Sequence, residues 1–325
     1  MSLFNSSFRL GRPALAALFF TGCAFAADPA FVLTSTTAIN GSTIVSGGNW
    51  RWAHGGFIMV DMVNPLVKSF TVVGRDGSIL SSFDFSIPET THVWVFGFDR
   101  DSVGNLVFSG EAYSSDGRLA PFIGIKPPNG GDVHLIRTYP YWPVALALAP
   151  DGTIWTVGGE WTYDRKSSGD SINPNGDAVR HFDRTGKLLG SAIPGQTLHP
   201  KYRHTDGFLV ATADRVGWYS PTQGPGTYIE FSPANPKEYK VYSGLPDAKS
   251  RAQGFALTDS GKAFVTNEVD YKIATYTLDR ATNQWTAVSF PSSDSSSPLT
   301  LRGSEKDTLV LEGVHGLHFF DAAAK

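Results

Sequence analysis

Five carboxylates recur along the chain where apolar segments end, and their type and spacing could support chemistry. They are Asp61, Glu111, Glu160, Glu268 and Glu312. Converging carboxylate oxygens are the ligands that a hard divalent cation such as calcium prefers. Exposed or paired carboxylates are the norm in proteins, so solvation, or ion pairs with Arg118 and Arg165, is the alternative. The pattern leaves a cation site and a set of ordinary acids both open.

A second group with possible chemistry is the segment LHPKYRHTDG, which contains His199, His204 and Asp206 together with Lys201 and Arg203. Imidazole can bind a metal or transfer a proton near neutral pH. The spacing matches no established ligand pattern, so an exposed polar loop is the alternative. A later histidine, also next to an apolar segment, could join this group. It is His315.

Aromatic residues fall in the same inter-strand segments as these charged groups. They are Trp50, Tyr113, Tyr141, Trp142, Trp161, Tyr163 and Tyr202. Rings with an apolar body and a polar tip serve ligand sites and interfaces, and they also pack between sheets. Carbohydrate recognition through Trp50, Trp142 and Trp161 is one form that a ligand site could take. By contrast, three other tryptophans within strands are expected only to pack between sheets: Trp94, Trp155 and Trp218.

The elements that must position these residues are copies of one repeated unit, clearest between Thr258 and Phe290. The turn DSG precedes the segment AFVTN, KIATYTL then alternates apolar and polar residues, and WTAVSF follows the polar turn DRATNQ. Alternation with a period of two predicts β-strands. A small antiparallel sheet cannot bury both faces alone, so the copies are expected to stack radially.

Six copies can be aligned by the turn before the second strand. These strands begin near Phe57, Leu106, Ile154, Val216, Ala263 and Leu309, at spacings of 49, 48, 62, 47 and 46 residues. The longest spacing comes from a polar insertion between Glu160 and Ala178, in the loop between the second and third strands. Long surface loops cost little stability and are often functional.

The last copy lacks a fourth strand, whereas the start of the chain has one to spare. Fourth strands are expected within 78–85, 132–139, 187–193, 239–244 and 285–290. The segment Phe31 to Ile39 would complete the sixth unit and leave no unpaired edge between the first and last sheets. We therefore predict an all-β chain, a six-bladed β-propeller closed by its N-terminal strand.

The first 26 residues have the features of a secretory leader: two arginines, the apolar run ALAALFF and an A-x-A site ending at Ala26. Residues 27–325 would then form one propeller domain in a secreted or periplasmic protein. The only cysteine, Cys23, lies within this leader; a lipid anchor on it is the alternative. The run is too short to span a bilayer, so no transmembrane segment is expected in the mature chain.

Charge and the absence of motifs exclude several classes of protein. Removing the leader would leave 25 basic and 30 acidic residues and a net charge of −5, without a basic cluster, so nucleic acid is not an expected partner. The sequence contains no G-x-S-x-G, H-E-x-x-H, phosphate-loop or G-x-G-x-x-G motif.

The segments SVGNLVFSG, APDGTIWTVGG and DSGKAFVTN resemble the repeat cores of NHL-type and gluconolactonase-like propellers, and AFVTNEVDYKIATYTLD resembles the YVTN repeat. The gluconolactonase resemblance implies a divalent cation in the central funnel, held partly by a Glu-Gly-Pro motif. This chain has NWRWAHGG in that region, and VALALAPDG where the family has an Asn-Gly before Ser-Pro-Asp-Gly.

The leading hypothesis is a non-catalytic exported module that binds a protein, small molecule or carbohydrate on the loop-rich face. The alternative is a metal-dependent hydrolase or lactonase. In that alternative the recurring carboxylates are ligands, and a loop histidine is acid or base.

Overall fold

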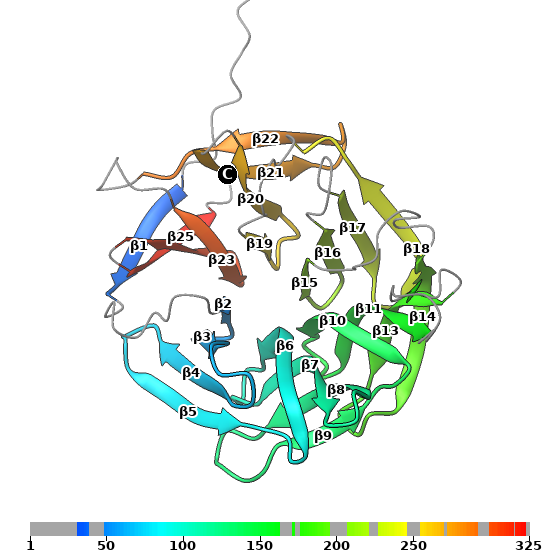
Figure 1. Ribbon diagram of the computed structural model, residues 1–325. Coiled ribbons are helices and arrows are strands. Elements are labelled where there is room, and N and C mark those ends of the chain that lie inside the picture. Colours follow the sequence, from blue (N-terminus) through cyan, green and yellow to red (C-terminus); the bar gives the residue numbers. More distant parts are fainter. Residues whose placement is uncertain are drawn as a thin grey trace, which may run out of the picture.

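The computed structural model describes residues 31–38, 49–162, 171–172, 176–195, 207–220, 227–245, 254–269, 272–291, 299–314 and 316–322. These residues form six antiparallel sheets arranged around a centre, with the first strand of each blade innermost and the fourth at the rim (Figure 1). The prediction of a six-bladed propeller is confirmed. No helix in these ranges is long and apolar enough to cross a bilayer.

The first three blades follow the chain in order. Blade 1 consists of β2 (Asn49–Ala53), β3 (Gly56–Asp61), β4 (Lys68–Gly74) and β5 (Ile79–Phe85). Blade 2 consists of β6 (Thr90–Arg100), β7 (Leu106–Ser114), β8 (Leu119–Lys126) and β9 (His134–Arg137). Blade 3 consists of β10 (Tyr141–Leu148), β11 (Ile154–Thr162), β13 (Asp177–Phe182) and β14 (Leu188–Pro194). The short β12 (Ser171–Ile172) lies in the predicted insertion and pairs with the end of β11.

The remaining blades repeat the pattern. Blade 4 consists of β15 (Phe208–Ala211), β16 (Val216–Ser220), β17 (Thr227–Ser232) and β18 (Asn235–Tyr242). Blade 5 consists of β19 (Gly254–Leu257), β20 (Ala263–Val269), β21 (Lys272–Asp279) and β22 (Gln284–Val288). Blade 6 consists of β23 (Thr300–Glu305), β24 (Thr308–Gly313), β25 (Gly316–Ala322) and β1 (Phe31–Thr37). Four second strands begin at the predicted residue, and β3 and β24 begin one residue earlier.

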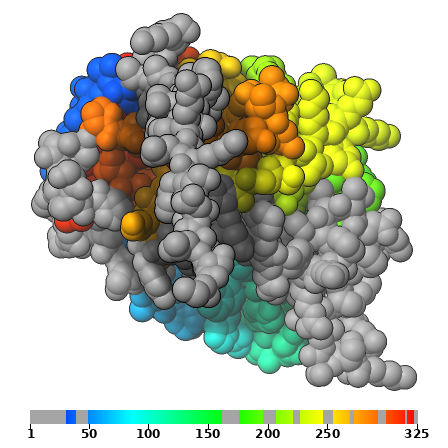
Figure 2. All heavy atoms as spheres, turned by 90° about the horizontal axis from the view of Figure 1, so that it is seen from above, coloured from blue at the N-terminus to red at the C-terminus, as the bar shows by residue number. Residues whose placement is uncertain are grey.

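The ring closes where the two ends of the chain meet. β1 pairs antiparallel with β25, from Phe31 opposite Ala322 to Thr37 opposite Leu317. Figure 2 shows the blue first strand beside the orange and red segments of the last blades. The predicted closing strand is therefore confirmed. It ends at Thr37, and Ile39 lies outside the described residues.

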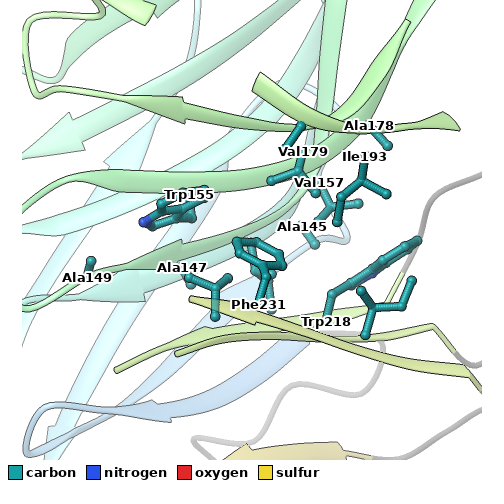
Figure 3. Packing of buried hydrophobic residues seen from close by; sticks show 14 residues of the cluster. Ala145, Ala147, Ala149, Trp155, Val157, Ala178, Val179, Ile193, Trp218 and Phe231 are labelled. Carbon is teal, nitrogen blue, oxygen red and sulfur yellow. The ribbon is translucent and has the colours of Figure 1, made fainter. Parts of the chain in front are cut away.

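Buried apolar side chains fill each of the six junctions between neighbouring blades. Between blades 3 and 4, Trp155 and Val157 face Trp218 and Phe231 (Figure 3). Because side chains of a strand alternate between faces, each sheet supplies one apolar face to each neighbour. The core is therefore a ring of inter-blade layers, as the stacking argument requires.

Three inner strands carry a β-bulge that inserts one extra residue: Phe96 in β6, Val144 in β10 and Arg302 in β23. A bulge re-aims the side chain that it inserts. Glycines lie opposite two of the bulges. A Cβ on Gly110 would lie 2.0 Å from Trp94 O, and one on Gly158 would lie 1.9 Å from Trp142 O. These positions have no room for a side chain.

We expect Gly158→Ala to lower the free energy of unfolding by about 2 kcal/mol, because the new methyl group overlaps a backbone oxygen and the strands must shift. Gly190→Ala is the matched control, since a Cβ there meets nothing within 4 Å. Urea denaturation of both variants measures the difference. Equal midpoints for the two variants would show that the bulge tolerates a side chain.

Arg51 joins three inner strands near the centre of the ring. Its Nη1 donates to Phe98 O at 3.2 Å and to Leu146 O at 3.0 Å. Its Nη2 lies 3.5 Å from Asp99 Oδ2, which accepts a 2.9 Å hydrogen bond from Leu148 N. An innermost strand has no neighbour on its central side, so side chains or water must satisfy its free backbone groups there. Arg51 and Asp99 do this for blades 2 and 3.

Candidate functional site

The candidate site is the upper face, defined here as the face formed by the second-to-third-strand and fourth-to-first-strand connections. All five predicted carboxylates lie towards the ends of second strands on this face, in β3, β7, β11, β20 and β24. Their surroundings differ from those of a shared metal site. In blades 3 and 6 the carboxylate pairs with an arginine that lies against an aromatic ring, and in blade 1 a lysine lies against a ring.

In blade 6 the carboxylate is Glu312. Arg302 donates from Nε to Glu312 Oε2 at 2.5 Å, and its guanidinium carbon lies 5.0 Å from the centre of the Trp50 ring. Only 14% of each charged side chain is exposed. The bulge in β23 inserts Arg302 at this point. We call Trp50, Arg302 and Glu312 the blade 6 clamp.

In blade 3 the carboxylate is Glu160, which accepts a hydrogen bond from Arg180. The Arg180 guanidinium carbon lies 4.3 Å from the centre of the Tyr141 ring, and Tyr141 is opposite Glu160 across the strand pair. The Tyr141 hydroxyl donates to Ala178 O at 3.0 Å, and burial raises the pKa of this tyrosine. Tyr141 therefore stays neutral, and its ring packs against the Arg180 guanidinium.

In blade 1 the basic residue is Lys68, whose side chain is fully buried. Its ammonium group donates to Met62 O and Asn64 O and lies 5.9 Å from the centre of the Trp94 ring. Burial lowers the pKa of Lys68, and the negative charge of Asp61 acts in the opposite direction. Blade 1 therefore repeats the cation and the ring, but its lysine bonds backbone carbonyls and Asp61 acts on it only through its charge.

This arrangement bears on the predicted cation site. Arginine neutralises Glu160 and Glu312, so their oxygens are already engaged. Among the described residues, no three His, Cys, Asp or Glu side chains are grouped so that they could hold a metal ion. The carboxylates of the described chain do not fit a shared divalent cation. The expected partners also differ: Arg118 pairs with Asp116, and Arg165 lies outside the described ranges.

The predicted aromatic residues are spread over several blades. Trp50 belongs to the blade 6 clamp, and Trp142 is buried with its ring edge-on to Phe96 at 5.3 Å. Tyr113 is partly exposed in β7. The backbone of Trp161 pairs with Ile172. Six other candidates fall outside the described residues: Tyr163, His199, Tyr202, His204, Asp206 and His315.

The expectation for the three strand tryptophans is confirmed for two and wrong for one. Trp155 and Trp218 are buried between blades 3 and 4. Trp94 is 43% exposed. Its neighbours in β6, Val93 and Val95, fill the junction with blade 1, so Trp94 lies on the opposite face of the strand.

The sequence reasoning missed Phe96, Arg302, Arg180 and Lys68. Phe96 and Arg302 reach their positions through bulges. Gly110, in the strand segment FSGE, was the sequence signal for the bulge at Phe96. No comparable signal marked Arg180 or Lys68. Their contacts depend on how far a long side chain reaches along its own blade.

We expect Arg302→Gln to lower the free energy of unfolding by about 1 to 2 kcal/mol, because it removes a largely desolvated ion pair and a cation–ring contact. A double-mutant cycle with Glu312→Gln should give a coupling of about 1 kcal/mol. Arg118→Gln is the matched control. Its ion pair with Asp116 has an arginine that is 86% exposed, and its loss should cost almost nothing. Equal effects of the two arginine variants would contradict a stabilising clamp.

Comparison with known proteins gives no family match. No protein-family model matches the chain, and no curated protein sequence matches it. Similar solved structures include a chain of a nidogen/laminin complex, with 11% identity, a TM-score of 0.46, and coverage of 81% of this chain and 84% of that one. TolB from Acinetobacter baumannii has 13% identity, a TM-score of 0.44, and coverage of 82% and 63%. A gluconolactonase from Xanthomonas campestris has 14% identity, a TM-score of 0.43, and coverage of 90% and 96%.

At these identities the likeness concerns the fold alone. The chain spans less than two thirds of the TolB chain that it resembles. The architecture itself follows from six four-stranded blades and from the pairing of the first strand with the last blade. The chain is thus an all-β six-bladed propeller closed by its N-terminal strand.

Proposed function

We propose that this protein is an exported binding module whose upper face holds a ligand or a protein partner. The observation that carries the proposal is the blade 6 clamp, in which Trp50, Arg302 and Glu312 are fixed against one another. The sequence features of the first 26 residues support export.

A fixed clamp favours binding for an energetic reason. Ordering a long side chain on association costs about 0.5 to 1.5 kcal/mol. Arg302 is already held by an ion pair and a ring, so much of this cost is removed before a ligand arrives. A charged group with fixed direction beside an indole also discriminates between partners, because wrongly placed charges are repelled.

A panel of saccharides, short peptides and lactones, added separately to the purified protein, tests the proposal. We expect at least one class to raise the melting temperature saturably, because a ligand that binds only the folded state stabilises it. Trp50→Ala should abolish this shift, whereas Lys237→Ala, at an exposed position of the rim strand β18, should retain it. Turnover of a lactone that is insensitive to Trp50→Ala and Arg302→Gln would overturn the proposal.

Removal of divalent ions gives a separate prediction. Because Glu160 and Glu312 are engaged by arginines, we expect EDTA to leave the melting temperature unchanged. Differential scanning calorimetry with and without chelator measures this. A tightly bound ion would instead contribute several kcal/mol of apparent stability, which chelation would remove. A marked fall in melting temperature would favour the metal-dependent alternative.

A further inference from the structure

We propose that the turn between β8 and β9 is a site of spontaneous covalent modification, at which Asn129 loses ammonia and becomes aspartate or isoaspartate. The turn has the sequence PPNGGD at residues 127–132, and all of these residues are exposed. It joins the third and fourth strands of blade 2, so it lies on the face opposite the blade 6 clamp. The modification is therefore separate from the proposed ligand site.

The reaction is an intramolecular substitution at the side-chain amide. The backbone nitrogen of Gly130, after losing its proton to solvent, forms a bond with Asn129 Cγ. The side-chain nitrogen takes up a proton and leaves as ammonia. Water then opens the cyclic imide at either carbonyl, which gives aspartate or isoaspartate. Glycine favours this attack because it has no Cβ to hinder the approaching nitrogen. Water is the only other reactant.

Both reacting groups of this turn are unengaged. Among the described residues, neither the Asn129 side chain nor the Gly130 nitrogen has a hydrogen-bond partner. A Cβ built on Gly130 would meet nothing within 4 Å, so there is open space beside the attacking nitrogen. No interaction of the folded chain therefore has to be broken before the amide carbon and the nitrogen approach each other.

The Asp151-Gly152 pair of blade 3 shows the opposite arrangement. An Asp-Gly pair can form the same cyclic imide with loss of water. Here Asp151 Oδ1 accepts from Thr153 N at 2.9 Å and from Thr153 Oγ1 at 2.6 Å. Gly152 N donates to Ala149 O at 2.8 Å. The carboxyl group and the nitrogen must both give up hydrogen bonds before they react, so this turn opposes the reaction.

The modification changes the charge beside a contact between two blades. Lys126 donates to Gly131 O, and its ammonium group lies 5.2 Å from the centre of the Phe83 ring on β5 of blade 1. A carboxylate at position 129 attracts this ammonium group and makes the net charge more negative. Isoaspartate also lengthens the backbone of the turn by a methylene group. The contact between Lys126 and Phe83 is therefore the first to be affected.

The test compares reaction rates in the folded full chain with those in two synthetic peptides, of residues 125–134 and 147–156. All samples are incubated at mildly alkaline pH and mapped by liquid chromatography and mass spectrometry. The tryptic peptide 119–137 contains no other asparagine or glutamine, so its mass increase reports Asn129 alone. Isoaspartate at Asp151 is followed by its chromatographic separation. Asn129→Gln is the control variant, because its longer side chain must close a larger ring, and its urea midpoint establishes that it is folded.

We expect Asn129 to react in the folded chain within about twofold of its rate in the peptide, because no contact opposes the reaction. Asp151 should react at least about tenfold more slowly in the folded chain than in its peptide. The mass increase in peptide 119–137 should be absent in Asn129→Gln. Protection of Asn129 by more than about tenfold in the folded chain would overturn the proposal. Equal rates for Asp151 in the chain and in its peptide would also count against it, since hydrogen bonds of the turn would then not control the reaction.

Discussion

Phe31→Ala should lower the free energy of unfolding by about 4 kcal/mol, because it removes the buried aromatic ring that anchors the strand closing the propeller and leaves a cavity. Phe31 is buried between blades 5 and 6, with its ring centre 4.5 Å from that of Phe290 and 6.0 Å from that of Phe264. The other buried residue of β1 is Thr37, at the opposite end. One side chain thus supplies most of the apolar burial of the closing strand.

Equilibrium denaturation in urea measures this effect, and Val32→Ala is its control. Val32 is the next residue and is 55% exposed, so its truncation should change stability by less than about 0.5 kcal/mol. A loss below about 1 kcal/mol for Phe31→Ala would mean that backbone pairing with β25 alone holds the closing strand. The ring would then not depend on this anchor.

Glu230→Gln should lower the free energy of unfolding by about 3 kcal/mol, because it removes the negative charge shared by two arginines. Glu230 lies on β17 of blade 4 and is buried. Its carboxylate accepts from Arg215 Nη1 at 3.0 Å, from Arg280 Nε at 3.0 and 3.1 Å, and from the Tyr228 hydroxyl at 2.8 Å. Arg280 follows β21 of blade 5, so this group ties two blades together.

The substitution keeps the shape of the side chain and leaves both guanidinium groups without their counter-charge. Each arginine is partly exposed, so water compensates for some of the loss. Glu238→Gln, at an exposed position of the neighbouring β18, is the control and should be nearly neutral. Urea denaturation of both variants measures their free energies of unfolding. A difference of less than about 1 kcal/mol between the two variants would contradict the role assigned to Glu230.

Glu230 also predicts a pH dependence. Burial acts to raise the pKa of Glu230, but hydrogen bonds from Arg280 and Tyr228 and the charges of both arginines outweigh it, so this pKa is lowered. A group whose pKa is lower in the folded state stabilises the protein above its unfolded value, about 4.3 for glutamate. That contribution is lost as the pH falls through the folded value. The stability difference between the native protein and Glu230→Gln should therefore be full at neutral pH and shrink below about pH 4.

The architecture of this chain follows from local patterns in its sequence. Turns such as DSG and the alternation in KIATYTL act over a few residues, so each strand and its two faces can be read locally. The spacing of the repeated units predicted the number of blades. Because the last unit lacks a fourth strand, the sequence also predicted that a strand from the start of the chain completes it. Observed pairing of β1 with β25 agrees with this.

The contacts of the candidate residues, by contrast, depend on how the blades pack in three dimensions. Glu312 and Glu160 lie at similar places near the ends of second strands. Glu312 pairs with Arg302, which a bulge inserts into an inner strand, whereas Glu160 pairs with Arg180 of a third strand. Alternation places Trp94 on one face of β6, but whether another blade covers that face depends on the packing of whole sheets. Strand periodicity is a local property. Side-chain partners depend on backbone shifts of a few ångströms between segments far apart in sequence, which local patterns do not encode.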